Sequence, residues 1–475
     1  MSRRTTLFVS LAVVVAAVAA YIIIRNLPEK PYEPPPRQER IVHLNILSKD
    51  IESIRLVRGE DDVLELNRVE TEEDGETKSV WTISEPTIAF TPKRTALSDI
   101  VYSMSNIYSN QVIEESPKEL AVYGLDAPIA RATVRSIEED DVTVTVGKKT
   151  PTGVSYYVRI NDSETVYSMR KYTVDKIFTV IDDFREATIP APNLQALAYF
   201  RIEGERTIEI EQIEEEEGSD LAFSSPLRLT QPYDGLRPID TQRFQETVET
   251  IPPSFMIADF VEDAPADLSK YGLDDPRYEF EVRDAEENSL HLLFGDEASE
   301  THAYAKLADD TLVFTLPISA LQFLQVDPFT LVSKFLLIVD INRVDSFTVS
   351  RGGRTHTARI DRTNYDEEAK EGEVFYLDEV EIAEDPFKDF YQAVIGLLTD
   401  AENPDQQPLT TADVSIEYAL NEKVNVSSAR LDLVEVNKDF YAAYIDGESE
   451  FLVSDYQVEA IFNTAAAVLK NPAGE

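Results

Sequence analysis

The sequence predicts an α+β fold of three tandem repeated domains, each an antiparallel sheet with helices packed on one face, behind one N-terminal transmembrane helix. Three observations predict it. A long internal match recurs at a spacing of 148 residues, alternating apolar residues predict a hairpin at the start of each repeat, and apolar residues at helical spacing follow each hairpin. The 475 residues exceed what one ordinary core accommodates, so several domains are expected.

The internal match is centred on a Tyr-Gly-Leu-Asp-x-Pro motif that occurs twice. Residues 114–156 and 262–304 align without gaps and are identical at 14 of 43 positions. Residues 157–178 match residues 441–462 and indicate a third, divergent copy that lacks the motif. The predicted domains are a first repeat at 41–190, a second at 191–335 and a third at 336–475, behind an anchor at 1–25 and a proline-rich linker at 26–40.

Each repeat is expected to contain the same elements in the same order. Hairpins are predicted at residues 51–69, 198–213 and 344–360. Helices are predicted to follow at residues 92–110, 239–251 and 385–398. In the first repeat, a meander of three strands at 140–147, 155–160 and 165–169 then leads into a helix at 172–181.

The repeated motif is interpreted as a structural helix stop. Ser116 and Pro117 are suited to begin a short helix, and a glycine in the left-handed conformation would end it. A ligand-binding loop is the alternative interpretation. The motif residues are Tyr123, Gly124, Leu125, Asp126 and Pro128 in the first copy, and Tyr271, Gly272, Leu273, Asp274 and Pro276 in the second.

The N-terminus predicts the location of the protein. Residues 7–24 are uncharged and long enough to cross a bilayer as a helix. Arg3 and Arg4 favour a cytoplasmic N-terminus, so the rest of the chain would lie outside the cytoplasm, in the periplasm at the inner membrane. A cleaved signal peptide is the alternative, but the apolar run continues beyond the small residues at 17–19.

Composition excludes several kinds of partner and site. The formal net charge is −45, from 89 acidic and 44 basic side chains, so no nucleic-acid partner is expected. Cysteine is absent, which excludes disulfide-linked partners, zinc–thiolate sites and thiol nucleophiles.

The sequence carries none of the common catalytic or cofactor motifs that we sought. A Gly-x-Ser-x-Gly elbow, a phosphate-binding loop and a His-Glu-x-x-His helix are all missing. We therefore expect no enzymatic activity, no cofactor and no metal site. His291 and His302 flank a predicted hairpin; they would form either a metal pair private to the second repeat or, more simply, two exposed histidines.

The tryptophan strand at residues 79–86, the helix after it and the Tyr-Gly-Leu-Asp-x-Pro motif resemble the bacterial DUF4340 family, a domain of unknown function. The resemblance covers the first repeat well, the second moderately and the third weakly. It implies a single-span envelope protein that accompanies a gliding-type ABC transport system, with the membrane subunits of the transporter as partners.

The sequence is compatible with three classes of function. The first is a non-enzymatic, membrane-anchored scaffold outside the cytoplasm that serves as a transporter accessory subunit. The second is a binding module for an envelope ligand such as a glycan, a peptide or a cation. The third, an enzyme, would require a buried cluster of carboxylates or histidines in a cleft.

Overall fold

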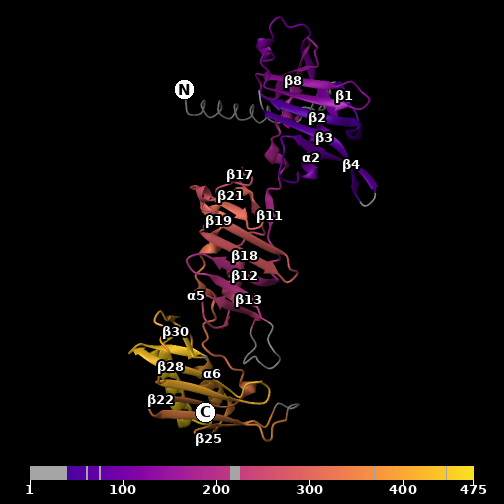
Figure 1. The fold of residues 1–475 in the computed structure, drawn as a ribbon. Coiled ribbons are helices and arrows are strands. Elements are labelled where there is room, and N and C mark those ends of the chain that lie inside the picture. Colours follow the sequence, from indigo (N-terminus) through magenta and orange to yellow (C-terminus); the bar gives the residue numbers. More distant parts are fainter. Residues whose placement is uncertain are drawn as a thin grey trace, which may run out of the picture. The chain divides into compact units, whose positions relative to one another are not determined.

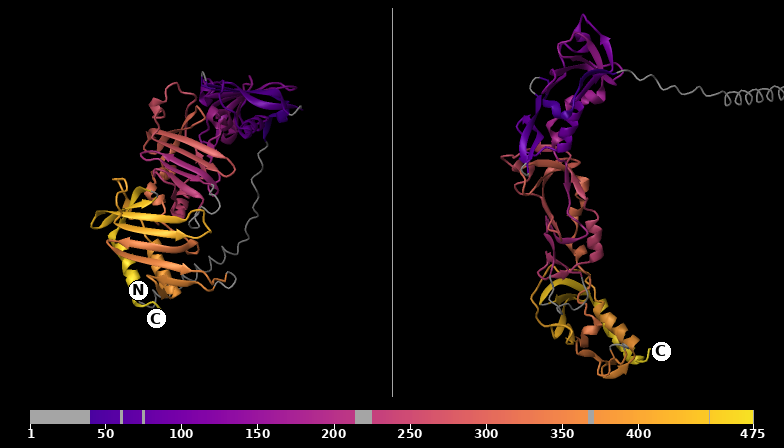
Figure 2. Two further views of the ribbon diagram at one scale, coloured as in Figure 1. Left: turned by 60° about the horizontal axis from the view of Figure 1, so that its bottom comes forward. Right: turned by 90° about the vertical axis from the view of Figure 1, so that its right-hand side faces the viewer.

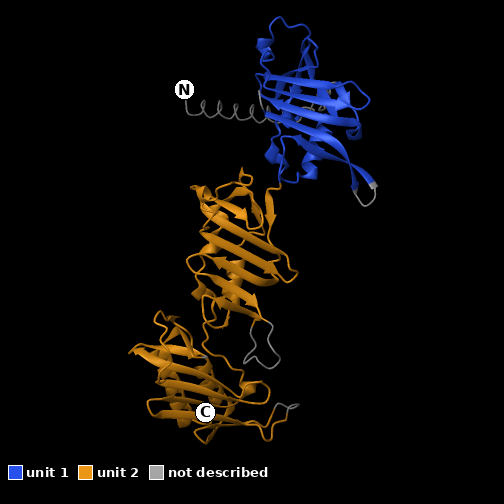
Figure 3. Ribbon diagram, viewed as in Figure 1, with its two compact units in different colours: residues 1–185 blue, residues 186–475 orange. Residues whose placement is uncertain are grey.

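A computed structural model describes residues 40–59, 62–73, 76–213, 225–366, 371–445 and 447–474. The chain separates into two compact units, unit 1 up to Arg185 and unit 2 from Glu186 (Figure 3). The expected anchor and most of the proline-rich linker lie outside the described residues. Among the helices of the described part, none has both the length and the apolar character needed to span a bilayer.

The predicted α+β class is wrong, because the structure is dominated by antiparallel strands. Antiparallel strands dominate the ribbon in Figure 1. Strands account for 45% of the described residues and helices for 20%. Segments expected as helix or loop form additional strands. The helix expected over 92–110 stops at Met104, and β5 (Asn106–Ser109) follows and pairs with β1 (Ile41–Asn45). The helix expected over 172–181 is reduced to one turn and two 3-10 turns.

Unit 1 is built on an eight-stranded antiparallel sheet, the first sheet, whose strand order is β4-β3-β2-β7-β8-β9-β10-β6. The predicted hairpin and meander are confirmed within it as β2–β3 and β8–β9–β10. The bounds are β2 Ile51–Arg58, β3 Asp62–Glu73, β4 Glu76–Glu85, β6 Gln111–Glu114, β7 Ala130–Ser136, β8 Val142–Lys149, β9 Ser155–Ile160, β10 Val166–Arg170, α2 Arg94–Met104, α3 Lys171–Val174, η3 Asp175–Phe178 and η4 Ile181–Phe184.

Unit 2 begins with a nine-stranded sheet, the second sheet, whose order is β15-β14-β13-β12-β18-β19-β20-β21-β17. A separate two-stranded ribbon is formed by β11 (Thr188–Pro190), which precedes the second sheet in the sequence, and β16 (Ser254–Met256), which lies between β15 and β17. The bounds are β12 Leu197–Glu203, β13 Ile208–Gln212, β14 Leu227–Gln231, β15 Arg237–Pro238, β17 Phe260–Glu262, β18 Tyr278–Asp284, β19 Ser289–Ser299, β20 His302–Leu307, β21 Val313–Pro317, α4 Thr241–Val248, η6 Ile318–Ala320, η7 Gln322–Gln325 and α5 Pro328–Leu331.

Unit 2 also contains a third sheet of nine strands, in the order β25-β24-β23-β22-β27-β28-β29-β30-β26. Its helices α6 and α7 lie side by side (Figure 2). The bounds are β22 Val344–Arg351, β23 Arg354–Asp361, β24 Val374–Leu377, β25 Val380–Ile382, β26 Ala401–Glu402, β27 Val414–Leu420, β28 Ser428–Asn437, β29 Phe440–Ile445, β30 Glu448–Ser454, η8 Ile341–Arg343, α6 Glu384–Ile395 and α7 Asp455–Lys470.

Each unit has its own apolar core, which follows from the alternation of residues along the strands. In unit 1, the inward residues of β2 pack with the buried side of α2, which consists of Leu97, Ile100, Val101 and Met104. In unit 2, one continuous cluster of buried side chains extends from Phe200 in the second sheet to Val468 in α7. The second and third sheets therefore share a single core.

Candidate functional site

Both copies of the repeated motif end a short 3-10 turn. The turns are η2 (Leu120–Tyr123) and η5 (Ser269–Tyr271). Gly124 follows the first with φ +67°, and Gly272 follows the second with φ +64°. This left-handed conformation disfavours any residue with a Cβ atom, so glycine is required at both positions.

The remaining motif residues lie between the 3-10 turn and the next strand. Leu125 and Leu273 are buried, with 5% and 3% of their surface exposed. Asp126 and Asp274 are exposed, and Pro128 and Pro276 are half-buried just before β7 and β18. The predicted helix start at Ser116 and Pro117 is wrong, because the 3-10 turn begins only at Leu120 and Glu119 before it is still extended.

A second glycine explains why the motif packs so closely on the sheet. Gly147 in β8 lies under the first copy, where an added Cβ would come within 2.2 Å of the Tyr123 carbonyl oxygen. Gly295 in β19 lies under the second copy, where the distance to the Tyr271 carbonyl oxygen would be 2.0 Å. These glycines, identical in the two copies, allow backbone to contact backbone.

Each motif tyrosine is hydrogen-bonded to a glutamate that occupies the same place in both copies. The Tyr123 hydroxyl donates to Glu114 Oε2 at 2.5 Å, and the Tyr271 hydroxyl donates to Glu262 Oε2 at 2.6 Å. These hydrogen bonds raise the pKa of both tyrosines. In the second copy Lys270 also pairs with Glu262, and its hydrogen bond lowers the pKa of that carboxylate.

Each motif tyrosine also packs edge-to-face on a tyrosine of the neighbouring strand. The ring centroids of Tyr123 and Tyr157 are 5.0 Å apart, and those of Tyr271 and Tyr304 are 4.9 Å apart. The gapless alignment instead pairs Tyr304 with Tyr156, which faces the core. Tyr157 and Tyr304 are the structural equivalents, because the first copy has one residue more between β8 and β9.

The third sheet shows why its repeat lacks the motif. In the third sheet, Val414 of β27 pairs with Leu433 of β28. At the equivalent place in the first sheet, Ala130 of β7 pairs with Val146 of β8. The next residue, Val434, therefore stands where the other sheets carry glycine. A β-branched side chain at this position closes the space that the motif occupies in the other two copies.

A groove of about 960 Å³ lies on unit 1, on the side of the first sheet that carries Tyr123 and Tyr157. Three strands contribute its floor and the β8–β9 loop contributes one wall. Its lining residues are Asn110, Gln111, Ile113, Thr150, Pro151, Thr152, Gly153, Val154, Ser155, Tyr157, Ser168, Arg170, Lys171, Tyr172 and Asp175. The sequence held no motif for this site, because the lining comes from several separate segments.

The two histidines considered as a metal pair do not meet. His302 lies at the turn end of the β19–β20 hairpin, opposite Ser299. His291 lies at the other end and hydrogen-bonds to Glu279 at 3.2 Å. Within the described ranges, no group of three or more His, Cys, Asp or Glu side chains is placed to hold a metal ion.

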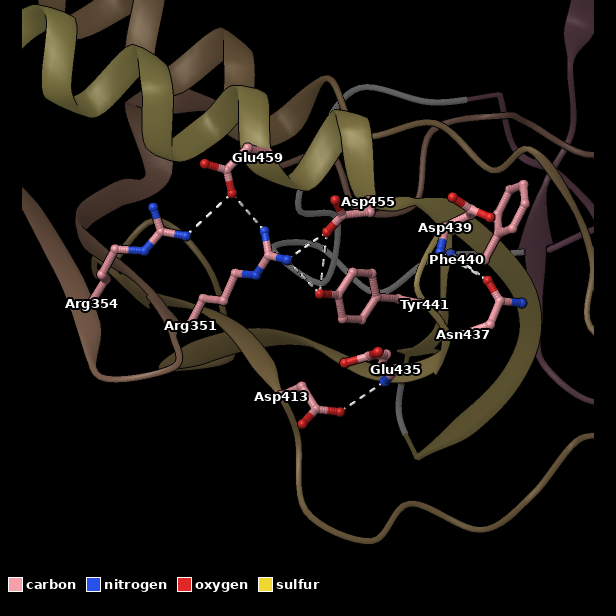
Figure 4. A network of polar contacts seen from close by, with 10 residues as sticks. All are labelled: Arg351, Arg354, Asp413, Glu435, Asn437, Asp439, Phe440, Tyr441, Asp455 and Glu459. Carbon is pink, nitrogen blue, oxygen red and sulfur yellow. Dashed lines mark hydrogen bonds and ion pairs between the residues drawn. The ribbon is translucent and has the colours of Figure 1, made fainter.

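A network of charges fixes α7 to the third sheet. Arg351, at the end of β22, donates from Nη1 to Glu459 at 2.8 Å and from Nη2 to the Tyr441 hydroxyl at 2.8 Å (Figure 4). The same Nη2 pairs with Asp455, and Arg354 joins through Glu459 at 3.2 Å. Arg351 and Arg354 are each paired with a carboxylate of α7, so these contacts tie the helix to β22 and β23.

A second set of charges joins the second and third sheets. Arg237 in β15 donates to Glu450 in β30 at 2.5 Å, and both side chains are buried. Beside this pair, the Tyr233 hydroxyl donates to Glu402 at 2.6 Å, and Arg206 pairs with the same carboxylate at 2.7 Å. Burial acts to raise the pKa of Glu402, but hydrogen bonds from Arg206 and Tyr233 lower it overall.

Comparison with known proteins identifies one family. The model described as "Domain of unknown function (DUF4340)" matches residues 81–266 and 254–393. The matches begin in β4 and end in α6, so they include parts of all three sheets. No curated protein and no solved structure matches the chain.

Proposed function

The chain belongs to the DUF4340 family, and on this premise we propose that it is a non-enzymatic scaffold outside the cytoplasm, held at the inner membrane by its apolar N-terminal segment. In this proposal it serves as an accessory subunit of an ABC-type transport system. The membrane subunits of that system are its partners. The apolar run at residues 7–24 supports the location. The transport role is what the family resemblance implies.

The junction of the second and third sheets carries the scaffold proposal. A scaffold must hold its binding surfaces at a fixed separation, which an easily bent linker between repeats would not do. Here the two sheets share one core, and the Arg237–Glu450 pair is buried between them. Two repeats that share a core in this way belong to one compact unit, which suits a structural role.

The polar residues singled out by the sequence support the same proposal. The motif tyrosines are hydrogen-bonded to carboxylates, and the strand glycines beneath the motif, Gly147 and Gly295, allow its close packing on the sheet. Their roles in the described structure are architectural. This use of the strongest motif favours a structural protein over an enzyme.

A pull-down from the native membrane tests the proposal. The full-length tagged protein is extracted in mild detergent, and its partners are quantified by mass spectrometry. The control is residues 1–40 fused to an inert soluble protein, which separates partners of the anchor from partners of the folded units. We expect ABC-type membrane and ATPase subunits in stoichiometric amounts with the full chain alone. Recovery of the protein by itself, or equal recovery with the control, would overturn the transport role.

One observation favours a second function, the binding of an envelope ligand. The groove on unit 1 has a volume in the range of small-molecule sites and is lined by polar and aromatic side chains. A scaffold subunit does not need such a groove.

A further inference from the structure

The floor of the groove is the outward face of three neighbouring strands. Strand pairing places Tyr157 of β9, Ser168 of β10 and Gln111 of β6 in one row across the sheet. Ser155 and Arg170 form a second row beside it. Residues that alternate along a strand point to the same face, so these side chains share one surface.

The walls rise from segments outside the strands. The β8–β9 loop, residues 150–154, forms one wall, and the turn into α3 forms another. The Tyr172 hydroxyl lies 2.5 Å from that of Tyr108, which holds the Tyr172 ring at the rim. Tyr172 remains 53% exposed. The groove thus presents two tyrosine rings, one in the floor and one at the rim.

The second sheet has the same frame but different residues at the groove positions. Tyr304 pairs with Thr315 in the second sheet, and its equivalent Tyr157 pairs with Ser168 in the first. Arg170 lies two residues after Ser168, so its counterpart is the residue two places after Thr315 in β21. That residue is Pro317, and Ile318 follows it where the first repeat has Lys171. The cations of the groove therefore have no counterpart at these positions in the second repeat, although the motif tyrosine and its partner ring are common to both.

The charge of the groove is opposite to that of the chain. The lining contains Arg170, Lys171 and Asp175, in a protein whose net charge is −45. Lys171 pairs with Asp175, whereas the exposed Arg170 guanidinium forms no hydrogen bond or ion pair with the described residues. One cation is thus left to pair with an anion from outside.

The other lining groups suit a hydroxylated ligand. Two amides and four aliphatic hydroxyls supply both donors and acceptors, as sugar hydroxyls require; they belong to Asn110, Gln111, Thr150, Thr152, Ser155 and Ser168. Tyrosine rings provide flat surfaces on which the carbon face of a sugar packs.

We propose that the groove on unit 1 binds an acidic saccharide, with Arg170 pairing with a sugar carboxylate and Tyr157 and Tyr172 packing on the rings. The site goes beyond the transporter role and does not depend on it. A peptide added as a strand would hydrogen-bond to the backbone along the free edge of β6. The groove lies on the face of the sheet instead, which favours a ligand recognised by side chains.

Titration calorimetry on the full-length protein in detergent tests the proposal. The probes are trimers of galacturonate, glucuronate and mannuronate. Each is paired with its methyl ester, which keeps the sugar and removes the negative charge. Tri-glutamate serves as an acidic probe that is not a saccharide. Arg170→Gln removes the proposed contact, and Arg131→Gln is the matched control, because Arg131 is an exposed arginine of β7 in the same sheet.

We expect at least one uronate trimer to bind, and its methyl ester to bind about tenfold more weakly, the loss expected for one charge-assisted contact. Arg170→Gln should weaken the binding of that trimer by a similar factor, and Arg131→Gln should leave it unchanged. Three outcomes would overturn the proposal: no binding of any trimer, equally tight binding of tri-glutamate, or equal losses in the two arginine variants. The pull-down result is independent of all three, so failure of one proposal leaves the other standing.

Discussion

The guanidinium of Arg237 and the carboxylate of Glu450 form a buried ion pair, although 213 residues separate them in the sequence. Only 8% and 2% of their side-chain surfaces are exposed. The backbone N–H of Asp234 also donates to Glu450, so the carboxylate is fully engaged. Because a buried charge is costly without a partner, this pair admits one arrangement of the second and third sheets and penalises others.

Removing one partner of this pair should therefore destabilise unit 2 strongly. Glu450→Leu leaves Arg237 buried without an anion, and we expect the free energy of unfolding to fall by about 3–5 kcal/mol. Urea denaturation followed by circular dichroism measures this change. The control is Arg206→Met, which removes a more exposed pair with Glu402 and should cost about 1 kcal/mol or less. Equal costs in the two variants would show that the buried pair does not fix the junction.

The strand glycines beneath the motif, Gly147 in β8 and Gly295 in β19, lead to a second prediction. Gly295→Ala would place a Cβ 2.0 Å from the Tyr271 carbonyl oxygen, and Gly147→Ala would place one 2.2 Å from that of Tyr123. Backbone atoms must move to relieve either contact, so we expect each variant to lose about 2–4 kcal/mol. Gly59→Ala is the control, because Gly59 has φ +64° and open space around its Cβ position.

At Gly59 only backbone strain opposes alanine, so the loss should be about 1 kcal/mol. Thermal unfolding of the three variants ranks them directly. If Gly295→Ala melts at the wild-type temperature, the close contact between motif and strand is not required for stability.

His43 makes the stability of unit 1 depend on pH. Its Nε2 atom lies 2.9 Å from the Ser109 hydroxyl, across the β1–β5 ribbon, and burial lowers the pKa of its imidazole. The unfolded chain therefore takes up a proton before the folded one does as the pH falls below about 6.5, the ordinary value. Stability from the neutral ring is present above that pH and is lost as the pH falls towards the lower folded pKa.

We expect amide hydrogen exchange in β1 and β5 to become faster, relative to the rest of unit 1, between pH 7 and pH 5. Exchange rates must first be corrected for the intrinsic effect of pH on each amide. His43→Gln should remove this additional acceleration, whereas His302→Gln in unit 2 should leave it in place. An unchanged pH profile in His43→Gln would exclude the histidine as its source.

The sequence predicts correctly those strands whose own residues alternate between apolar and polar. Period-two alternation placed the β2–β3 and β22–β23 hairpins correctly, because their apolar residues face one core. It misplaced residues 106–109, since their apolar spacing continues the α2 pattern and only pairing with β1, more than sixty residues earlier, makes them a strand. Distant partners of this kind explain why the fold was classified with too much helix.

The candidate functional features were likewise predictable from the sequence only where their residues are neighbours in the chain. The motif glycines were recognised, because a helix stop is a local signal. The groove and the Arg237–Glu450 pair were not, since their residues come from separate segments that only folding brings together. Arg170 and Glu450 are, in the sequence, two charged residues among 133 acidic and basic ones, and nothing nearby distinguishes them.

The Arg351 network leads to the last prediction, on the attachment of α7. Arg351 contacts Asp455 and Glu459, one turn apart at the start of the helix, and the Tyr441 hydroxyl of β29. A guanidinium makes these contacts together because its donors lie in one rigid plane. Arg351→Met should therefore weaken the attachment of α7 by about 1–2 kcal/mol, the pairs being partly exposed.

Hydrogen exchange of the α7 amides measures this effect without requiring global unfolding. Arg351→Lys keeps the charge but cannot reach three acceptors in one plane, so we expect it to restore only part of the protection. Arg354→Met is the matched control, because Glu459 is the one ion-pair partner of Arg354 among the described residues and the side chain is 51% exposed, its other contact with α7 being the Phe462 ring, 4.7 Å from the guanidinium. If Arg354→Met loosens α7 as much as Arg351→Met does, general charge balance around the helix, rather than the contacts of Arg351, holds α7 on the third sheet.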